Sequence, residues 1–471
     1  MNENRFDVVL AGNYLTNLVA AVGLAERGRK VCLANPIPAW GGHFSRVQVG
    51  DQIFDPGAVS HEFTVFADRT VADPLGFDPR RRNDVARFNA LIEDYTRSVI
   101  DLHRMETPET VYRGRMYPDI VMTNRFEILH DPQLEERVRV EQEHAAANPC
   151  PELHPRDKKD KPQYLTRSYY EASIANHGAT LHAAVFEPQF YKMSGLSTTR
   201  LLALFHRIAW LPVYYPETLR TQFTASPQVL PETYFCYPKA GHIGHFGEEL
   251  LRRFEAAGGT VVRDPIARLE GRGEKAIVLK DGRRISGRHL FWSLAHDMPW
   301  TQATGKPANV FERWSAMLVF ANIERRNLKR GFSVLYCPDD DALFYRACNQ
   351  TDSAGQGHDR VRAVIEVNPE YAARRGFADE ASVVARVRED LCRLGILGDP
   401  AHLEVAAART LRNVLLLPSR ENWKLLENER DALLSEYPDV VFTRNVEAFF
   451  ADTLNDQIVK GLRIAAQLAA G

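Results

Sequence analysis

The spacing with the clearest chemical meaning lies in residues 6–34, which predict a site for the phosphates of a dinucleotide. Residues 6–12 form an apolar run typical of a short buried strand, residues 15–28 have the pattern of a helix closed by glycine, and residues 30–34 form a second strand. A strand, a tight turn, a helix and a parallel strand within about 30 residues place a pyrophosphate at the helix N-terminus, where backbone amides point toward it. We therefore expect a Rossmann half here.

Two stretches after the second strand resemble the second fingerprint of a flavoprotein group. They are Trp40-Gly41-Gly42-His43-Phe44-Ser45 and Gly50-Asp51-Gln52-Ile53-Phe54-Asp55-Pro56-Gly57. The group comprises amine oxidases, protoporphyrinogen oxidase and UDP-galactopyranose mutase. The resemblance implies FAD as the cofactor, with Gly41, Gly42 and His43 among the residues that bind it, because a Gly-Gly turn lets backbone amides approach the FAD phosphates.

The first fingerprint departs from that of the group at three positions. The group's G-x-G-x-x-G pattern falls on residues 12–17, where Gly12 is kept but Tyr14 and Asn17 replace the second and third glycines. Asn35 stands where the group has an acidic residue that binds the ribose hydroxyls, and an amide carries no charge. These departures predict that FAD binding is weak or lost.

The resemblance implies further site residues in the middle of the chain. His61 follows the second fingerprint and is the nearest titratable residue to the flavin face, although a histidine satisfied in a loop is the alternative. Tyr345 and Arg346 look like the mutase segment in which an aromatic residue and an arginine face the diphosphate of a sugar nucleotide, and a forked planar cation suits that role. The alternative is a surface arginine on a sheet. Ile266 matches the residue that touches the adenine.

The C-terminal residues resemble the mutases more than the oxidases. Arg444 follows the last predicted strand, and Asp452 lies several residues later, as in the mutase pattern. A closing helix begins near Asp452 or Thr453, with Leu454 in its first turn. Its N-terminal amides would point at the flavin or at whatever replaces it.

His242 and His245 are three residues apart, as some metal ligands are. They lie in a glycine-rich turn, and we identify no third cysteine, histidine or carboxylate at a suitable spacing. The six cysteines show no CxxC pair or metal-like spacing either. The sequence therefore predicts no metal site.

The composition is that of an ordinary globular protein. The chain has 471 residues, 45% of them hydrophobic and 25% charged, which suffices for two or three domains. Lys and Arg total 59 against 61 Asp and Glu, so the charge balance gives no basis for nucleic-acid binding. We find neither a cleavable leader nor an apolar run of membrane-spanning length, and we expect a cytoplasmic protein.

Periodicity predicts the remaining elements. They are a helix at 84–100, an exposed linker or lid edge at 131–163, an aromatic-rich helical segment at 164–216, a helix and strand at 248–262, a β-meander at 265–294, strands at 317–321, 332–336 and 363–367, and a helix at 452–466.

The fold class expected from the resemblance is α/β, with a Rossmann-type FAD/NAD(P)-binding domain interleaved with a substrate domain of mixed helices and sheet. The FAD-type domain takes residues 1–65, 235–300 and 420–471. The substrate domain takes residues 66–234 and 301–419.

Two functions remain open at this point. The first is a flavoprotein-fold enzyme, either an oxidoreductase or similar to UDP-galactopyranose mutase, that acts on a small molecule, with a nucleotide sugar among the candidates. The second is a protein of this fold that has lost flavin and serves as a binding or scaffold protein, or as an enzyme that uses its own side chains in the vacated cleft. The damaged first turn favours the second function, and the stretch is also similar to that of Rab GDP-dissociation inhibitors, which have a comparable Leu-Thr in the turn, share the scaffold and work without FAD. The intact Gly41-Gly42 pair, Arg444 and the closing helix favour retention of FAD, and Leu15 and Thr16 of the first turn are then further candidates for binding it.

Overall fold

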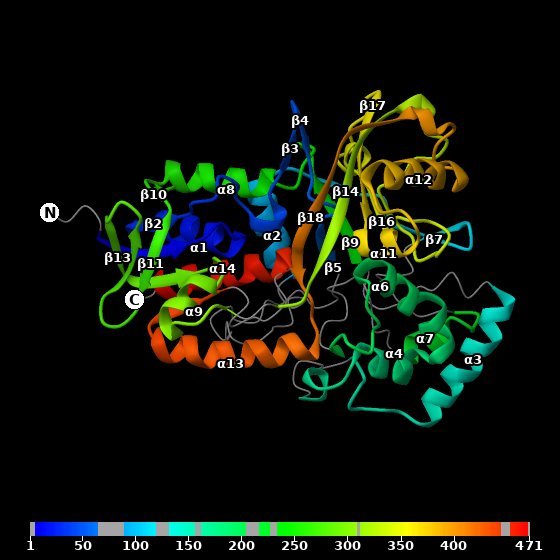
Figure 1. The fold of residues 1–471 in the computed structure, drawn as a ribbon, viewed down its shortest axis with the longest axis horizontal. Helices are drawn as coiled ribbons and strands as arrows, with labels where there is room; N and C mark the ends of the chain where they lie inside the picture. Colours follow the sequence, from blue (N-terminus) through cyan, green and yellow to red (C-terminus); the bar gives the residue numbers. More distant parts are fainter. Residues whose placement is uncertain are drawn as a thin grey trace.

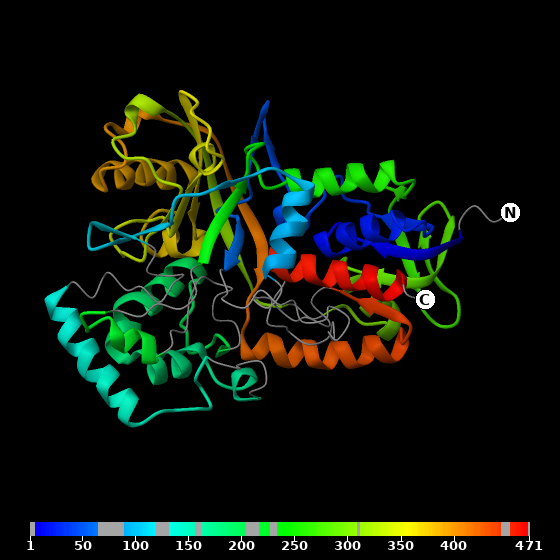
Figure 2. The ribbon, with the colours of Figure 1, turned by 180° about the vertical axis from the view of Figure 1, so that it is seen from behind.

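The computed structural model describes residues 5–64, 89–118, 131–155, 162–203, 216–226, 233–308, 311–443 and 453–469. These residues form two large sheets, with a group of helices packed beside the second one (Figure 1). The N-terminal strand and the C-terminal helix both belong to the part that contains the first sheet, as seen from either side (Figures 1 and 2). Among the described helices, none is long and apolar enough to cross a membrane.

The first sheet has a parallel core. Its strands, in spatial order, are β10 (Thr260–Val262), β2 (Val31–Ala34), β1 (Arg5–Ala11), β13 (Arg284–Trp292), β12 (Lys275–Leu279) and β11 (Ile266–Glu270), and β19 (Val440–Phe442) also pairs with β13. Only β11 and β12 run antiparallel to their neighbours. Successive side chains of β1 enter two different cores, Val8 and Leu10 on one face and Val9 and Ala11 on the other. Both faces of the sheet are therefore buried at β1, which explains the continuous apolar run of this strand in the sequence.

Helices cover both faces of the first sheet (Figure 1). One face packs against α1 (Leu15–Ala25), α2 (Asn89–Val99), α8 (His245–Ala256) and α14 (Leu454–Ala469), and the other against α9 (Asp297–Thr304) and α13 (Arg420–Glu436). Gly461 allows α14 to lie directly on α1, because a Cβ there would be 2.6 Å from Val19 Cβ. The expected α/β Rossmann-type arrangement is confirmed.

The second sheet is mostly antiparallel. Its strands, in spatial order, are β18 (Leu403–Leu416), β14 (Arg313–Glu324), β17 (Arg360–Val367), β16 (Arg346–Asn349), β15 (Val334–Tyr336), β7 (Glu109–Tyr112) and β8 (Arg115–Pro118). One face packs against α11 (Pro369–Arg374) and α12 (Glu380–Arg393), and the other meets the hairpin of β3 (Val47–Val49) and β4 (Gln52–Phe54). A small third sheet, β5 (His61–Thr64), β9 (Thr233–Pro238) and β6 (Leu102–Arg104), lies near α2 and α8.

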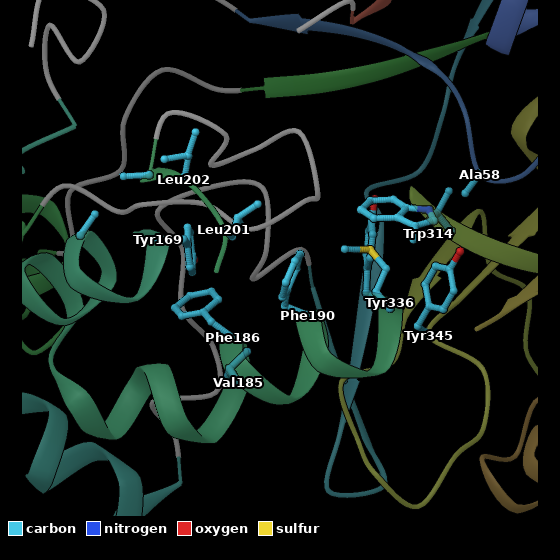
Figure 3. Packing of buried hydrophobic residues seen from close by; sticks show 14 of the residues in the cluster. Ala58, Tyr169, Val185, Phe186, Phe190, Leu201, Leu202, Trp314, Tyr336 and Tyr345 are labelled. Carbon is cyan, nitrogen blue, oxygen red and sulfur yellow. The ribbon is translucent and has the colours of Figure 1, made fainter. Parts of the chain in front are cut away.

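Residues 131–221 supply most of the helical group. Its elements are α3 (Pro132–Ala147), α4 (Tyr169–His177), α5 (Ala179–Leu181), a π-helical turn (His182–Phe186), α6 (Glu187–Ser194) and α7 (Pro216–Thr221). Tyr169, Phe186 and Phe190 of this group enter a core that also contains Trp314, Tyr336 and Tyr345 (Figure 3), whereas Tyr170 and Tyr191 are exposed. The buried aromatic residues of the described part, residues 162–203, therefore serve as packing that joins the helices to the second sheet.

Helix α3 contradicts the expectation of an exposed linker or lid edge over residues 131–163. The Asp131 side chain accepts hydrogen bonds from the amides of Gln133 and Leu134, and Pro132 occupies the first helical position. Leu134 and Val138, one turn apart, are buried, while the many charged residues lie on the other faces. The many charged residues suggested an exposed linker, although Asp131 and Pro132 are a typical start of a helix.

The two parts of the molecule alternate along the chain. Residues 5–34, 260–292 and 440–442 supply the first sheet, whereas residues 109–118 and 313–416 supply the second. The boundaries given above for the two domains stay a prediction.

Candidate functional site

The turn between β1 and α1, where a dinucleotide phosphate was expected, is shaped by one close contact. Gly12 has φ of 111°, and a Cβ at this position would lie 2.3 Å from Ser293 Oγ. Only glycine fits here, so the first position of the fingerprint keeps its structural role.

The side chain of Tyr14 covers the Gly41-Gly42 turn. Tyr14 is buried, and a Cβ added to Gly42 would lie 3.1 Å from two of its ring carbons. The ring of His43 meets it edge-on, with 6.1 Å between the ring centroids. Tyr14 thus fills the space beside the glycine pair, where backbone was expected to approach a phosphate.

Backbone amides at the same corner bond to other groups of the chain. The Leu15 amide, at the N-terminus of α1, donates to Oε1 of Gln457 from α14 at 3.0 Å. The Gly41 amide donates to the carbonyl oxygen of Asn13 at 2.8 Å, and Asn13 Nδ2 donates to the carbonyl oxygen of Ala39 at 2.9 Å. The two fingerprint loops are therefore joined directly by hydrogen bonds.

The two asparagines of the degenerate fingerprint have structural roles. Asn17 Nδ2 donates to Ser293 Oγ at 2.9 Å and to the carbonyl oxygen of Ala11 at 3.1 Å, so this side chain ties α1 to the ends of β1 and β13. Asn35 Nδ2 donates to the carbonyl oxygen of Ile37 at 2.5 Å, and its Oδ1 accepts from the Ile37 amide at 3.2 Å. Asn35 therefore closes its own turn rather than presenting an acceptor to a ribose.

These contacts test whether the residues present fit FAD. A bound diphosphate would occupy the space that the Tyr14 ring fills beside Gly42, and it would accept from the Leu15 amide that now donates to Gln457. Both would have to move, so this corner does not fit the cofactor as it stands.

The other predicted cofactor residues fall in different places. Thr16 is buried at the start of α1, and a Cβ at Gly461 of α14 would lie 2.7 Å from its carbonyl oxygen. Thr453 caps α14 by a reciprocal pair of bonds with Asp456, and Leu454 is buried in the core beneath. Ile266 begins β11 and packs partly against the core on the α13 side of the first sheet. Arg444 and Asp452 lie outside the described residues.

Arg346 and Tyr345 converge on Glu366, which the sequence analysis missed. Arg346 Nε and Nη2 donate to the two Glu366 oxygens, each at 2.8 Å, and the Tyr345 hydroxyl donates to Glu366 Oε2 at 2.9 Å. Only 13% of the Arg346 side chain and 4% of the Glu366 side chain are exposed. Burial opposes the charge on Arg346, but the adjacent Glu366 carboxylate outweighs it, and the pKa of Arg346 lies above its usual value. The arginine forms a buried ion pair, so the alternative of a surface arginine is wrong. A contact of Arg346 with a diphosphate stays a prediction, and the diphosphate would have to compete with Glu366.

Glu366 also fixes the end of the second fingerprint. Its Oε1 accepts from the Ala58 amide at 2.6 Å, and a Cβ at Gly57, where φ is 136°, would lie 2.9 Å from the same oxygen. Asp55 accepts from the Tyr237 hydroxyl at 2.5 Å and from the Ile243 amide at 2.9 Å. Buried acidic residues therefore connect the Asp-Pro-Gly stretch to β17 of the second sheet, to β9 of the third sheet and to the turn before α8.

His61 is a core residue in strand β5. It is fully buried, stacked near Phe63 and edge-on to Phe246, and neither ring nitrogen has a hydrogen-bond partner within the described ranges. Burial, with the charge of Arg97 acting in the same direction, lowers the pKa of His61 to about 3. Among the described residues the ring is enclosed by Phe63 and Phe246, which does not support proton transfer by His61, and its position near a flavin stays a prediction.

Replacing His61 with phenylalanine should make the protein less sensitive to acid. The unfolded chain takes up a proton at His61 below about pH 6.5, whereas the folded protein does not until about pH 3, so wild type loses stability as the pH falls between these values. The variant should avoid this loss, a difference of about 2 kcal/mol at pH 5. Urea unfolding at pH 8 and pH 5 measures the effect, with exposed His402→Ala as the control. Equal pH dependence of His61→Phe and wild type would show that the ring is charged or solvated when folded.

Glu366 and Gln457 carry most of what the sequence analysis missed at this site. Gln457 precedes Gly461 by one helical turn, and that glycine is a signal that another backbone approaches α14 closely. Glu366 ends an apolar strand, where a lone acidic residue indicates a buried partner.

The fold is shared with solved flavoprotein-group structures. A reduced UDP-galactopyranose mutase matches with a TM-score of 0.68 and 14% identity, covering 98% of this chain and 94% of its own. A putrescine oxidase bound to putrescine gives 0.60 and 14%, with 99% of each chain covered. A protein from Exiguobacterium sp. 255-15 assigned as a protoporphyrinogen oxidase gives 0.58 and 14%, covering 100% of this chain and 99% of its own. No protein-family model and no curated protein sequence matches this chain significantly.

These comparisons define the class of fold. The chain has the fold of the flavoprotein group that contains oxidases and UDP-galactopyranose mutase, as its second fingerprint predicts. Identities of 14% establish the fold alone, and the substrate has to be argued from the residues.

Proposed function

We propose that this protein is an enzyme of the flavoprotein fold that acts on a small molecule without a tightly bound FAD. The observation that carries the proposal is the position of Tyr14 over Gly42, in the space expected for the cofactor diphosphate. Two further contacts support it. The Gln457 side chain binds the Leu15 amide, which a FAD phosphate would need, and the Asn35 side chain bonds within its own turn instead of facing a ribose. On this proposal the chain's own side chains, rather than a flavin, carry the chemistry.

The purified wild-type protein should carry no stoichiometric flavin. The Tyr14 ring and the Gln457 side chain on the Leu15 amide would both have to be displaced. Added FAD should therefore bind weakly, and micromolar FAD should not raise the melting temperature. The visible absorbance after gel filtration and a FAD titration followed by thermal unfolding measure this. Yellow protein with one FAD per chain would overturn the proposal.

A second candidate function is a flavoenzyme, either an oxidoreductase or a mutase that acts on a nucleotide sugar. The positive φ angles of Gly12, Gly41 and Gly42 favour it, because the backbone of both fingerprint loops keeps the conformation that glycine permits. On this alternative Tyr14 swings away when FAD enters. Micromolar FAD would then bind to the wild type, and UDP-galactose would bind to that complex more tightly than to the free protein.

A further inference from the structure

The turn that leads into α8 brings together three metal-ligating side chains. His242, His245 and Glu248 each offer one ligand atom, and these atoms lie within 4.8 Å of one another. His242 Nε2 is 3.9 Å from Glu248 Oε2, and the two imidazole rings are 5.9 Å apart at an interplanar angle of 71°. The expectation that no third ligand accompanies the two histidines is therefore wrong, because one helical turn separates His245 from Glu248 and places both on one face.

The turn is held in place from several sides. The Ile243 amide donates to the buried Asp55, and Arg362 Nη2 donates to the Gly241 carbonyl oxygen at 3.1 Å. Gly244 packs so closely on the chain at Arg46 that a Cβ would lie 2.6 Å from the Arg46 amide nitrogen. The ligand groups are thus presented by a fixed backbone.

The buried histidine has a polar atom with no protein partner. Only 7% of His242 is exposed, and its Nδ1 has no hydrogen-bond partner within the described ranges. Its other ring nitrogen, Nε2, is the one that lies 3.9 Å from Glu248 Oε2. A buried imidazole with a nitrogen that no described protein group occupies is available to a metal ion.

Glu248 is also oriented by a neighbour. Arg46 Nε lies 3.2 Å from Glu248 Oε1, which leaves the other carboxylate oxygen facing His242. This ion pair orients the carboxylate, as outer partners commonly do for carboxylates that bind metals. Two imidazoles favour zinc-like ions over hard cations such as Mg²⁺ and Ca²⁺, which depend on several oxygen ligands, whereas the Arg46 charge weakens the binding of any divalent cation.

We propose that His242, His245 and Glu248 form a binding site for Zn²⁺ or a similar divalent transition metal. Ligand atoms that lie about 2.0–2.1 Å from a tetrahedral Zn²⁺ are about 3.4 Å from one another. The present ligand atoms lie within 4.8 Å of one another, and rotation of the partly exposed His245 and Glu248 side chains can bring them to that distance. Three protein ligands leave a fourth position for water, as in catalytic zinc sites. His245 also borders a surface cavity of about 350 Å³ that Arg97 and Lys239 line, so solvent and small anions can reach this side of the site. The site is independent of the flavin question, because none of the three ligands belongs to the phosphate corner.

Metal titration of the full-length, tag-free protein tests the site. After chelator treatment, the protein should bind one Co²⁺ per chain with the visible ligand-field absorption of a low-coordinate site, and Zn²⁺ should displace it. His245→Ala and Glu248→Gln, which change partly exposed residues, should each weaken Co²⁺ binding at least tenfold. The exposed His144→Ala on α3 is the matched control and should bind as wild type does.

Thermal unfolding provides a second measurement that does not depend on activity. Zn²⁺ should raise the melting temperature of wild type and His144→Ala but not of the two ligand variants, because a ligand that binds only the folded state stabilises it. Wild type without a saturable one-to-one Co²⁺ signal would overturn the proposal. Equal affinities of wild type, His245→Ala and Glu248→Gln would overturn it as well, and neither result would bear on FAD.

Discussion

Replacing Glu366 with glutamine is expected to destabilise the protein by about 3–5 kcal/mol, because it removes one partner of a buried ion pair and leaves the other charge uncompensated. Glutamine has nearly the same shape, so lost packing contributes little. Its neutral oxygen also makes weaker bonds to Arg346, to the Tyr345 hydroxyl and to the Ala58 amide, which all meet at this carboxylate.

Glu404→Gln is the matched control on the same sheet. Glu404 pairs with Arg360, but their side chains are 68% and 49% exposed, and solvent-exposed pairs contribute only about 0–1 kcal/mol. The free energies of unfolding in urea should therefore separate the two variants clearly. If Glu366→Gln were no less stable than Glu404→Gln, the Arg346 charge would have to be solvated or neutralised in another way.

The double variant Arg346→Met with Glu366→Leu separates charge from packing. Replacing a buried ion pair by apolar residues of similar volume is often neutral or stabilising. The double variant should recover most of the loss, but not all, since the Ala58 amide and the Tyr345 hydroxyl lose their acceptor at about 1–3 kcal/mol for each buried group left unpaired. A double variant that is less stable than Glu366→Gln would show that packing, rather than charge, dominates at this position.

The sequence predicted those parts of the fold whose causes are local. The apolar run of β1, the helix that follows with its closing glycine, and the antiparallel strands β11 to β13 all show in local stretches of the sequence. Helix α8 was expected from Glu248 onward, but it begins at His245, and that difference of one turn is what brings His245 and Glu248 onto one face. An error of one turn in the predicted start of a helix thus changes the fold little but changes which side chains meet at the site.

The closure of the phosphate corner could not be predicted in the same way. Gln457 caps the Leu15 amide from 442 residues away, and Glu366 accepts from Ala58 across 308 residues. Residue types at 14, 17 and 35 indicated that something was lost from the fingerprint, but only tertiary packing shows that the chain's own side chains took the space. His61 is a further example, because its burial depends on Phe246, which belongs to α8 and is distant in the sequence.

Removing the Tyr14 ring should restore measurable FAD binding. Tyr14→Gly opens the space beside Gly42, and the variant should bind FAD at least tenfold more tightly than wild type, which corresponds to about 1.4 kcal/mol. Asn17 and Asn35 are left unchanged, because their bonds to Ser293 and Ile37 hold the corner together. Tyr14→Phe keeps the ring and should behave as wild type does.

Stability provides the internal check on the Tyr14→Gly result. Loss of a buried aromatic ring costs about 3–5 kcal/mol, so the variant should melt well below wild type without ligand, and FAD should return part of that loss by binding only the folded state. Fluorescence titration gives the affinity, and thermal unfolding with and without FAD gives the stabilisation. If the variant is folded at the titration temperature and its FAD affinity equals that of Tyr14→Phe, the ring is not what excludes the cofactor. The Gln457 cap on the Leu15 amide would then be the remaining obstacle at this corner, and Gln457→Ala in the same background would be the variant to compare.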